Sequence, residues 1–113
     1  RKRITRLDLT GNHIKEIPID AFNGLINLKK LNLANNQIRT ITAGSFNGLI
    51  NLQELNLMTN QIRTVPANTF NGLINLKKLN LWGNQMFTGL LQLTKAQRPN
   101  IRAQVPARCE IKF

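Results

Sequence analysis

The chain has 113 residues, a length that suits one domain, and its formal net charge is +11. This excess of Lys and Arg favours attraction to anions but does not bear on the fold. No apolar run approaches the ~20 residues that a membrane-spanning helix needs. The single cysteine, Cys109, cannot form a disulfide within the chain. We expect it to be a tail residue without a special role, or to have paired with a cysteine outside this sequence.

The sequence begins with Arg1 rather than Met, and no apolar leader segment follows. We therefore expect either a secreted chain that has lost its signal or a piece cut from a longer protein.

The dominant feature of the chain is an internal repeat with a period of 24 residues. Two short segments recur at this period. They are Leu-Asn-Leu at 31–33, 55–57 and 79–81, preceded by Leu-Asp-Leu at 7–9, and Phe-Asn-Gly-Leu-Ile-Asn-Leu at 22–28, 46–52 and 70–76. A single repeat cannot bury its own Leu, Ile and Phe side chains, so stacked repeats are expected to share one continuous core.

Each repeat is predicted to begin with a short strand, because Leu alternates with polar residues there. These strands are expected near 5–9, 29–33, 53–57 and 77–81. An Asn follows the second Leu by three residues in each repeat, at positions 12, 36, 60 and 84. The backbone turns inward at this point and leaves buried polar groups, which an amide side chain can satisfy. We therefore assign Asn12, Asn36, Asn60 and Asn84 to a structural Asn ladder.

The unit from Leu28 to Asn51 reads L-x-x-L-x-L-x-x-N-x-I-x-x-I-x-x-x-x-F-x-x-L-x-x, and it resembles the 24-residue class of leucine-rich repeats in extracellular receptors and matrix proteins. The resemblance covers about residues 4–93. It implies an α/β fold, a curved right-handed parallel β-solenoid of about three and a half repeats with a short C-terminal helix. It also implies an extracellular or cell-surface location. The chain departs from this class because it lacks the cysteines of the usual end caps, so we expect that an N-terminal cap has been lost.

The pattern breaks after the fourth strand. Residues 87–93 echo 70–76, but Phe87 follows Asn84 by only three residues. We therefore divide the chain into repeats at 1–84 and an atypical truncated repeat with a C-terminal cap at 85–113. Helical spacing predicts a helix over 89–97, Pro99 disfavours helix at the residue before it, and weak alternation allows a short strand over 101–105.

The sequence offers no catalytic site. The only histidine, His13, takes the repeat position that Gln37 and Gln61 fill in the next two repeats, which indicates a surface variant of that Gln. No two of the five acidic residues share a position in adjacent repeats, so no paired-carboxylate site is predicted. No Cys, His or acid cluster has metal-ligand spacing, and no glycine-rich phosphate loop is present. We expect no enzyme activity, cofactor or metal.

The leading functional prediction is protein–protein recognition through the concave sheet, which is the usual mode of the family that the chain resembles. The predicted face comprises Arg6, Asp8, Lys30, Asn32, Glu54, Asn56, Met58, Lys78, Asn80 and Trp82. Trp82 is the sharpest candidate, since Trp is enriched among binding hot spots. The alternative is that Trp82 packs under the C-terminal cap. The Asn residues between the leucines are expected to be solvated or bonded between strands rather than to select a ligand.

Two other functions remain open at this point. A basic ladder of Lys15, Arg39 and Arg63, together with the basic tail, suits an anionic polymer or lipid such as a sulfated glycan, lipopolysaccharide or nucleic acid. A structural, self-associating fragment of a larger repeat protein would instead pair through uncapped ends or through a ridge of isoleucines. These isoleucines are Ile26, Ile50 and Ile74, which we expect to be half buried against the loop.

Overall fold

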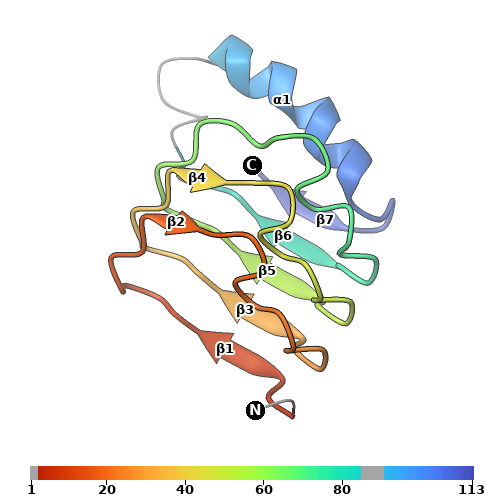
Figure 1. The fold of residues 1–113 in the computed structure, drawn as a ribbon. Coiled ribbons are helices and arrows are strands. Elements are labelled where there is room, and N and C mark those ends of the chain that lie inside the picture. The colour runs from red at the N-terminus through yellow and green to blue at the C-terminus, as the bar shows by residue number, and fades with distance from the viewer. Residues whose placement is uncertain (1–2, 85–90) are drawn as a thin grey trace.

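The structure of the protein, a computed structural model, describes residues 3–84 and 91–113, with the backbone alone described for 91–97. The chain winds as a β-solenoid, and each coil of 24 residues adds one strand to a common sheet (Figure 1). In chain order the elements are β1 (Arg6–Asp8), β2 (Glu16–Ile17), β3 (Lys30–Asn32), β4 (Thr40–Ile41), β5 (Glu54–Asn56), β6 (Lys78–Asn80), α1 (Leu91–Gln104) and β7 (Glu110–Lys112).

The main sheet has five parallel strands in the order β1-β3-β5-β6-β7. Leu31 pairs with Leu55 and Leu55 with Leu79, so the register between neighbouring strands equals the sequence period. Because alternate side chains of a strand point to opposite faces, each central Leu points inward and its polar neighbours point outward. β2 and β4 form a second, two-stranded parallel sheet across the coil (Figure 1). The predicted curved parallel β-solenoid is therefore confirmed.

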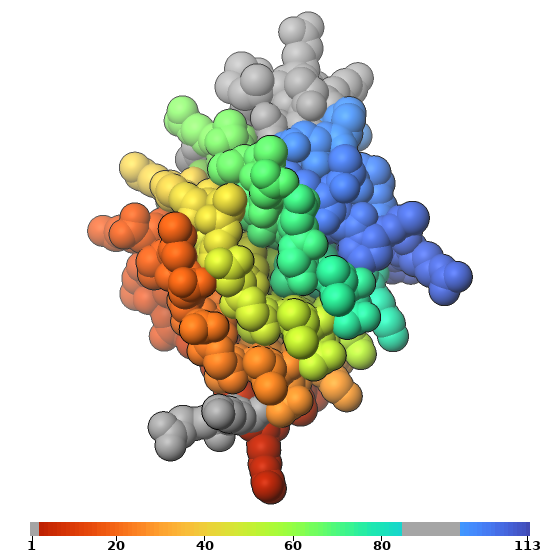
Figure 2. Space-filling model, turned by 45° about the vertical axis from the view of Figure 1, so that its right-hand side comes forward, coloured from red at the N-terminus to blue at the C-terminus, as the bar shows by residue number. Residues whose placement is uncertain are grey.

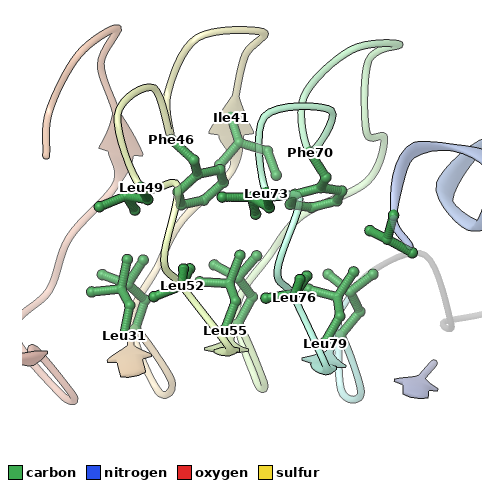
Figure 3. Packing of buried hydrophobic residues seen from close by; sticks show 14 of the residues in the cluster. Leu31, Ile41, Phe46, Leu49, Leu52, Leu55, Phe70, Leu73, Leu76 and Leu79 are labelled. Carbon is green, nitrogen blue, oxygen red and sulfur yellow. The ribbon is translucent and has the colours of Figure 1, made fainter. Parts of the chain in front are cut away.

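The core lies between these two sides of the coil. Leu31, Leu55 and Leu79 form one column along the solenoid, with Leu52 and Leu76 between them (Figure 3). All five side chains are almost completely buried. A fully buried Leu contributes roughly 1.5–3 kcal/mol relative to an exposed one. The repeated leucines are therefore a large part of the apolar core.

A second column consists of phenylalanine rings. The ring centroids of Phe22 and Phe46 are 6.2 Å apart with an interplanar angle of 2°. Those of Phe46 and Phe70 are 5.8 Å apart at 23°. All three side chains are buried, and Figure 3 shows Phe46 and Phe70 above the leucine columns. The rings thus form a stacked spine in which Phe46 has an aromatic neighbour on each side.

A left-handed residue turns the chain after each of the first four strands of the main sheet. Gly11, Asn35, Thr59 and Gly83 all have positive φ, between 56° and 78°. Gly and Asn adopt this conformation readily, whereas a β-branched residue such as Thr59 does so at a cost. A Cβ at Gly83 would lie 3.0 Å from Thr59 Oγ1, so the coils approach closely here. The left-handed turn therefore recurs with the period of the strands.

The C-terminal helix is longer than predicted. α1 continues through Pro99 to Gln104, so the short strand expected over 101–105 is wrong. Contacts with the third coil explain why the helix continues. Ile101 is completely buried, and two polar side chains of α1 bond to the backbone of the third coil. Asn100 Nδ2 donates to Val65 O at 2.8 Å, and Gln104 Oε1 accepts the N–H of Phe70 at 2.8 Å. The start of the predicted helix, at 89–90, lies outside the described residues.

A fifth strand, β7, covers the edge of β6. The N–H of Glu110 donates to Lys77 O at 2.8 Å, and the N–H of Leu81 donates to Lys112 O at 2.7 Å. The guanidinium of Arg102 in α1 donates to Cys109 O at 2.7 Å and also to Pro106 O. These bonds fix the segment between α1 and β7 against the last coil.

The coils are visible from outside as adjacent bands. In the space-filling view, the bands succeed one another from red to green, and the blue C-terminal residues lie against the green ones (Figure 2).

Within residues 3–84 and 91–113, no helix is both long enough and apolar enough to cross a membrane.

Candidate functional site

The outward side chains of the main sheet form two rows across all five strands. We call this surface the sheet face. Its first row is Arg6, Lys30, Glu54, Lys78 and Glu110, and its second row is Asp8, Asn32, Asn56, Asn80 and Lys112. Every strand residue predicted for the concave face lies in one of these rows, and β7 adds Glu110 and Lys112.

The first three strands surround a shallow hollow on the sheet face. Its polar lining consists of Arg6, Asp8, Lys30, Asn32, Glu54 and Asn56. Lys30 Nζ lies 3.2 Å from Glu54 Oε2, and both side chains are exposed enough for solvent to weaken this ion pair. The structure therefore brings six of the predicted face residues together around one depression of mixed charge.

The Asn residues of the second row hold the turn that follows each strand. Asn32 Oδ1 accepts the N–H of Ala34 at 3.0 Å, and Asn56 Oδ1 accepts that of Met58 at 2.9 Å. Asn80 Oδ1 accepts the N–H of Trp82 at 3.0 Å. Because each Oδ1 already accepts the N–H of the residue two positions later, the NH₂ group is the part of each amide that a ligand can meet. This local bond differs from the strand-to-strand bonding that the sequence left open.

Asp8 takes the place of Asn in the first strand. Its carboxylate accepts the hydroxyl of Thr10 at 2.6 Å and the N–H of Thr10 at 3.0 Å. These two bonds, the hydroxyl first, hold the pKa of the Asp8 carboxyl below its ordinary value. Asp8 therefore stays negatively charged at neutral pH and well below it.

Trp82 extends the sheet face beyond the end of β6, because it follows Asn80 by two residues and so points to the same side. Its side chain is 53% exposed, so the C-terminal segment does not bury it. Its backbone is nonetheless well held, because the N–H of Thr59 donates to Trp82 O at 2.8 Å. Half-buried Met58 takes the same position in the preceding coil, and Asn80 Nδ2 lies 3.8 Å from its Sδ. Trp82 is thus a large apolar surface on a fixed backbone.

The structural Asn ladder lies under the turns, away from the sheet face. Asn60 Oδ1 accepts the N–H of Ile38 at 3.0 Å, and its Nδ2 donates to Leu33 O at 3.0 Å and Leu57 O at 3.1 Å. The amide therefore joins two neighbouring coils. Asn36 and Asn84 make the corresponding bonds, whereas Asn12 is exposed.

Residues of the basic ladder are exposed and lie outside the two rows of the sheet face. Arg39 Nε donates to Gln61 Oε1 at 2.9 Å, and Gln37 Nε2 lies 3.3 Å from His13 Nδ1. His13 thus meets a neutral amide in the next coil. Among the described residues, no three His, Cys, Asp or Glu side chains come together where they could hold a metal ion.

Several surface features were not predicted from the sequence. Glu110 and Lys112 join the sheet face as part of β7. The only sequence signal for this strand is one polar–Ile–polar triplet, which is weak.

A second amide ladder links the loops below the strands, because Asn51 Nδ2 donates to Ile26 O and Asn75 Nδ2 to Ile50 O, both at 2.7 Å. The recurrence of Asn at this position was the available signal. The isoleucines of the ridge are 46%, 49% and 65% exposed, so Ile74 protrudes more than half burial would allow.

Cys109 is a buried free thiol. Burial raises its pKa, and the nearby Arg102 charge offsets this only in part. Because the thiolate is the reactive form, we expect folded protein at pH 8 to react with a thiol reagent many times more slowly than protein unfolded in urea. Absorbance after addition of a chromogenic disulfide measures both rates. Equal rates would show that the segment before β7 does not stay packed.

The chain is similar to known proteins in both sequence and structure. A family described as leucine rich repeat matches residues 2–62. A solved leucine-rich-repeat protein of Leptospira interrogans is 31% identical, with a TM-score of 0.78 over 97% of this chain and 25% of that chain. The TLR13–ssRNA13 complex contains a chain that is 39% identical, with a TM-score of 0.62 over 75% of this chain and 13% of that chain. None of the curated proteins compared with the chain matches it.

These matches cover the solenoid but only a part of the larger proteins. The chain spans about a quarter of the Leptospira chain and a smaller share of the TLR13 chain. The family match covers more than half of the 113 residues, and the 24-residue coil recurs in the structure. The chain therefore belongs to the leucine-rich repeat family.

Proposed function

We propose that the sheet face is a non-catalytic site for a protein partner, with Trp82 as its apolar anchor. The observation that carries this proposal is a tryptophan that is 53% exposed on a backbone fixed by hydrogen bonds. A rigid aromatic side chain loses little conformational freedom on binding, and Trp is enriched among residues that dominate interface energies. Met58 beside it extends the apolar area. The remaining rows supply a polar rim of the kind that surrounds interface centres.

The charges of the sheet face support a protein rather than a polyanion at this site. Lys30, Glu54, Lys78 and Glu110 alternate in sign along the first row. Asp8 adds a further negative charge at the start of the second. A partner with charges of both signs complements such a pattern, whereas a chain of phosphates meets repulsion at every carboxylate. For this reason we do not infer RNA binding at this face from the similarity to the TLR13–ssRNA13 complex.

The width of the face limits what it can hold. Five strands spaced by about 4.8 Å make a surface roughly 19 Å across. That width suits one helix or loop of a partner protein more than a broad, flat domain surface. We place this recognition outside the cell as part of the proposal, since burial of Cys109 shields the only thiol from oxidants there.

Trp82→Ala tests the proposal directly. Proteins captured by the immobilised wild-type chain are identified, and the affinity of each purified partner for the two chains is measured by calorimetry. We expect the substitution to weaken a true partner by about 2 kcal/mol, or roughly 30-fold in Kd. Ile50→Ser removes an exposed apolar side chain away from the sheet face and serves as the matched control, with unchanged affinity. Equal affinities for wild type and Trp82→Ala would overturn the proposal.

A self-associating structural role makes the opposite prediction. Light scattering would then give a mass above 12.8 kDa at both low and high salt, and Trp82→Ala would leave that mass unchanged.

A further inference from the structure

The basic ladder has a fixed geometry. Lys15, Arg39 and Arg63 occupy one position in three successive coils. The N–H of Arg39 donates to Lys15 O at 2.9 Å, and the N–H of Gln61 donates to Ile38 O at 2.9 Å. Neighbouring coils are therefore joined directly at the ladder. The three cations cannot move apart along the backbone to relieve their mutual repulsion.

Two hollows lie between the side chains of the ladder. Lys15, Gln37, Arg39 and Gln61 line the first. Arg39, Gln61, Arg63 and Thr64 line the second. The hollows share Arg39 and Gln61, and they have no lining residue in common with the hollow of the sheet face. Every lining side chain carries a hydrogen-bond donor, and none carries a carboxylate.

The shared pair is held by a hydrogen bond. Arg39 Nε donates to Gln61 Oε1 at 2.9 Å, which uses one of the five guanidinium N–H groups. Because Gln61 accepts with its oxygen, the rest of its amide is the donor Nε2 group. A bond of this kind orients both side chains before a ligand arrives, which lowers the entropy that binding must overcome.

Acidic side chains are distributed so that the second hollow is the more positive. Glu16 follows Lys15 and belongs to β2. The same position holds Thr40 and Thr64 in the next two coils, which are neutral. The ion pair between Lys30 and Glu54 lies on the sheet face, away from both hollows. The other two side chains that line the second hollow, Gln61 and Thr64, are neutral donors.

We propose that the two hollows form a binding site for a sulfated polysaccharide. Sulfate oxygens accept charge-assisted bonds from Arg and Lys, and amide and hydroxyl donors complete the set. Two adjacent hollows with a shared Arg39 suit two sulfate groups carried on one linear chain. Sites for single-stranded nucleic acid add aromatic side chains on which bases stack, and no aromatic residue lines either hollow. Trp82, the exposed tryptophan, lies beyond the end of β6 on the side of the sheet face.

The test uses a size-fractionated heparin oligosaccharide and the full chain. The ladder variant combines Arg39→Gln with Arg63→Gln. The control variant combines Lys29→Gln with Lys77→Gln, which removes the same charge from repeat-related, exposed positions outside both hollows. We expect the ladder variant to lose about tenfold or more in affinity, and its slope of log K against log salt to fall by about 1.5. The control should lose only the small general effect of net charge. Circular dichroism confirms that both variants fold.

Gln61→Glu is a second variant, because it places one carboxylate at the border of both hollows. We expect it to weaken heparin binding at least as much as the loss of one ladder cation does. Equal losses in the ladder and control variants would overturn the proposal, since affinity would then follow net charge. Two other results would also overturn it. They are equally tight binding of chemically desulfated heparin, and tighter, ladder-dependent binding of a single-stranded RNA of equal length.

Discussion

Phe46→Ala should lower the free energy of unfolding by about 4 kcal/mol. Phe46 is buried, and its ring centroid lies 6.2 Å from that of Phe22 and 5.8 Å from that of Phe70. Removal of the central ring leaves a void between two rings that are held in separate coils. Neither coil can close that void without breaking the strand register. The loss therefore includes a cavity term as well as the transfer of apolar surface to water.

Urea unfolding followed by circular dichroism measures this loss. Phe22→Ala is the matched control, because Phe22 stacks on one ring only and we expect a smaller loss of about 2–3 kcal/mol. Phe46→Leu is the milder variant to use if Phe46→Ala does not fold. Equal losses at the two positions would mean that the rings do not act as a continuous spine.

Asn60→Ala is expected to cost about 3 kcal/mol. The substitution leaves the N–H of Ile38 without its acceptor and takes a donor from the carbonyls of Leu33 and Leu57. Asn60 is buried, so water does not readily replace the amide. A buried polar group left without a partner costs about 1–3 kcal/mol, and this change creates more than one.

Asn12→Ala tests whether burial and contact between coils are responsible. Asn12 holds the equivalent sequence position, but it is exposed and its side-chain Nδ2 donates to nearby Thr10 O at 3.3 Å. We expect a loss under about 1 kcal/mol there, measured by thermal and urea unfolding in parallel with Asn60→Ala. Similar losses for the two substitutions would show that the ladder stabilises single turns rather than joining coils.

The repeated part of the fold was predictable because its period fixes the register. A spacing of 24 residues between Leu31 and Leu55 translates directly into their pairing across β3 and β5. The outward rows of the first four strands follow from the same alternation, so the sequence places these residues of the sheet face without knowledge of side-chain contacts. The sequence did not predict which Asn side chains bond within their own turn and which bond to a neighbouring coil. Asn32 holds its own turn, whereas Asn36 reaches into the preceding coil.

The C-terminal segment was not predictable in the same way, because no repeat constrains it. Local preference ends the helix near Pro99, yet α1 continues to Gln104. The side chains of Asn100 and Gln104 bond to the third coil only in this helical arrangement, and these distant contacts outweigh the local preference. β7 is equally non-local. Ile111 becomes a strand residue because Leu79 offers it an open edge.

The equal spacing of the coils also governs how the chain can change in length. The N–H of Leu33 donates to Asn56 O at 2.8 Å, and the N–H of Leu57 donates to Asn80 O at the same distance. A duplicated segment of one period would therefore find matching partners both before and after it. A one-residue change inside a strand would turn its side chains to the wrong face, whereas the segment between two strands can differ in length, because β7 pairs in register with β6 after a longer connection than one period. The sheet therefore grows one strand at a time, and each added coil widens its recognition surface by about 4.8 Å.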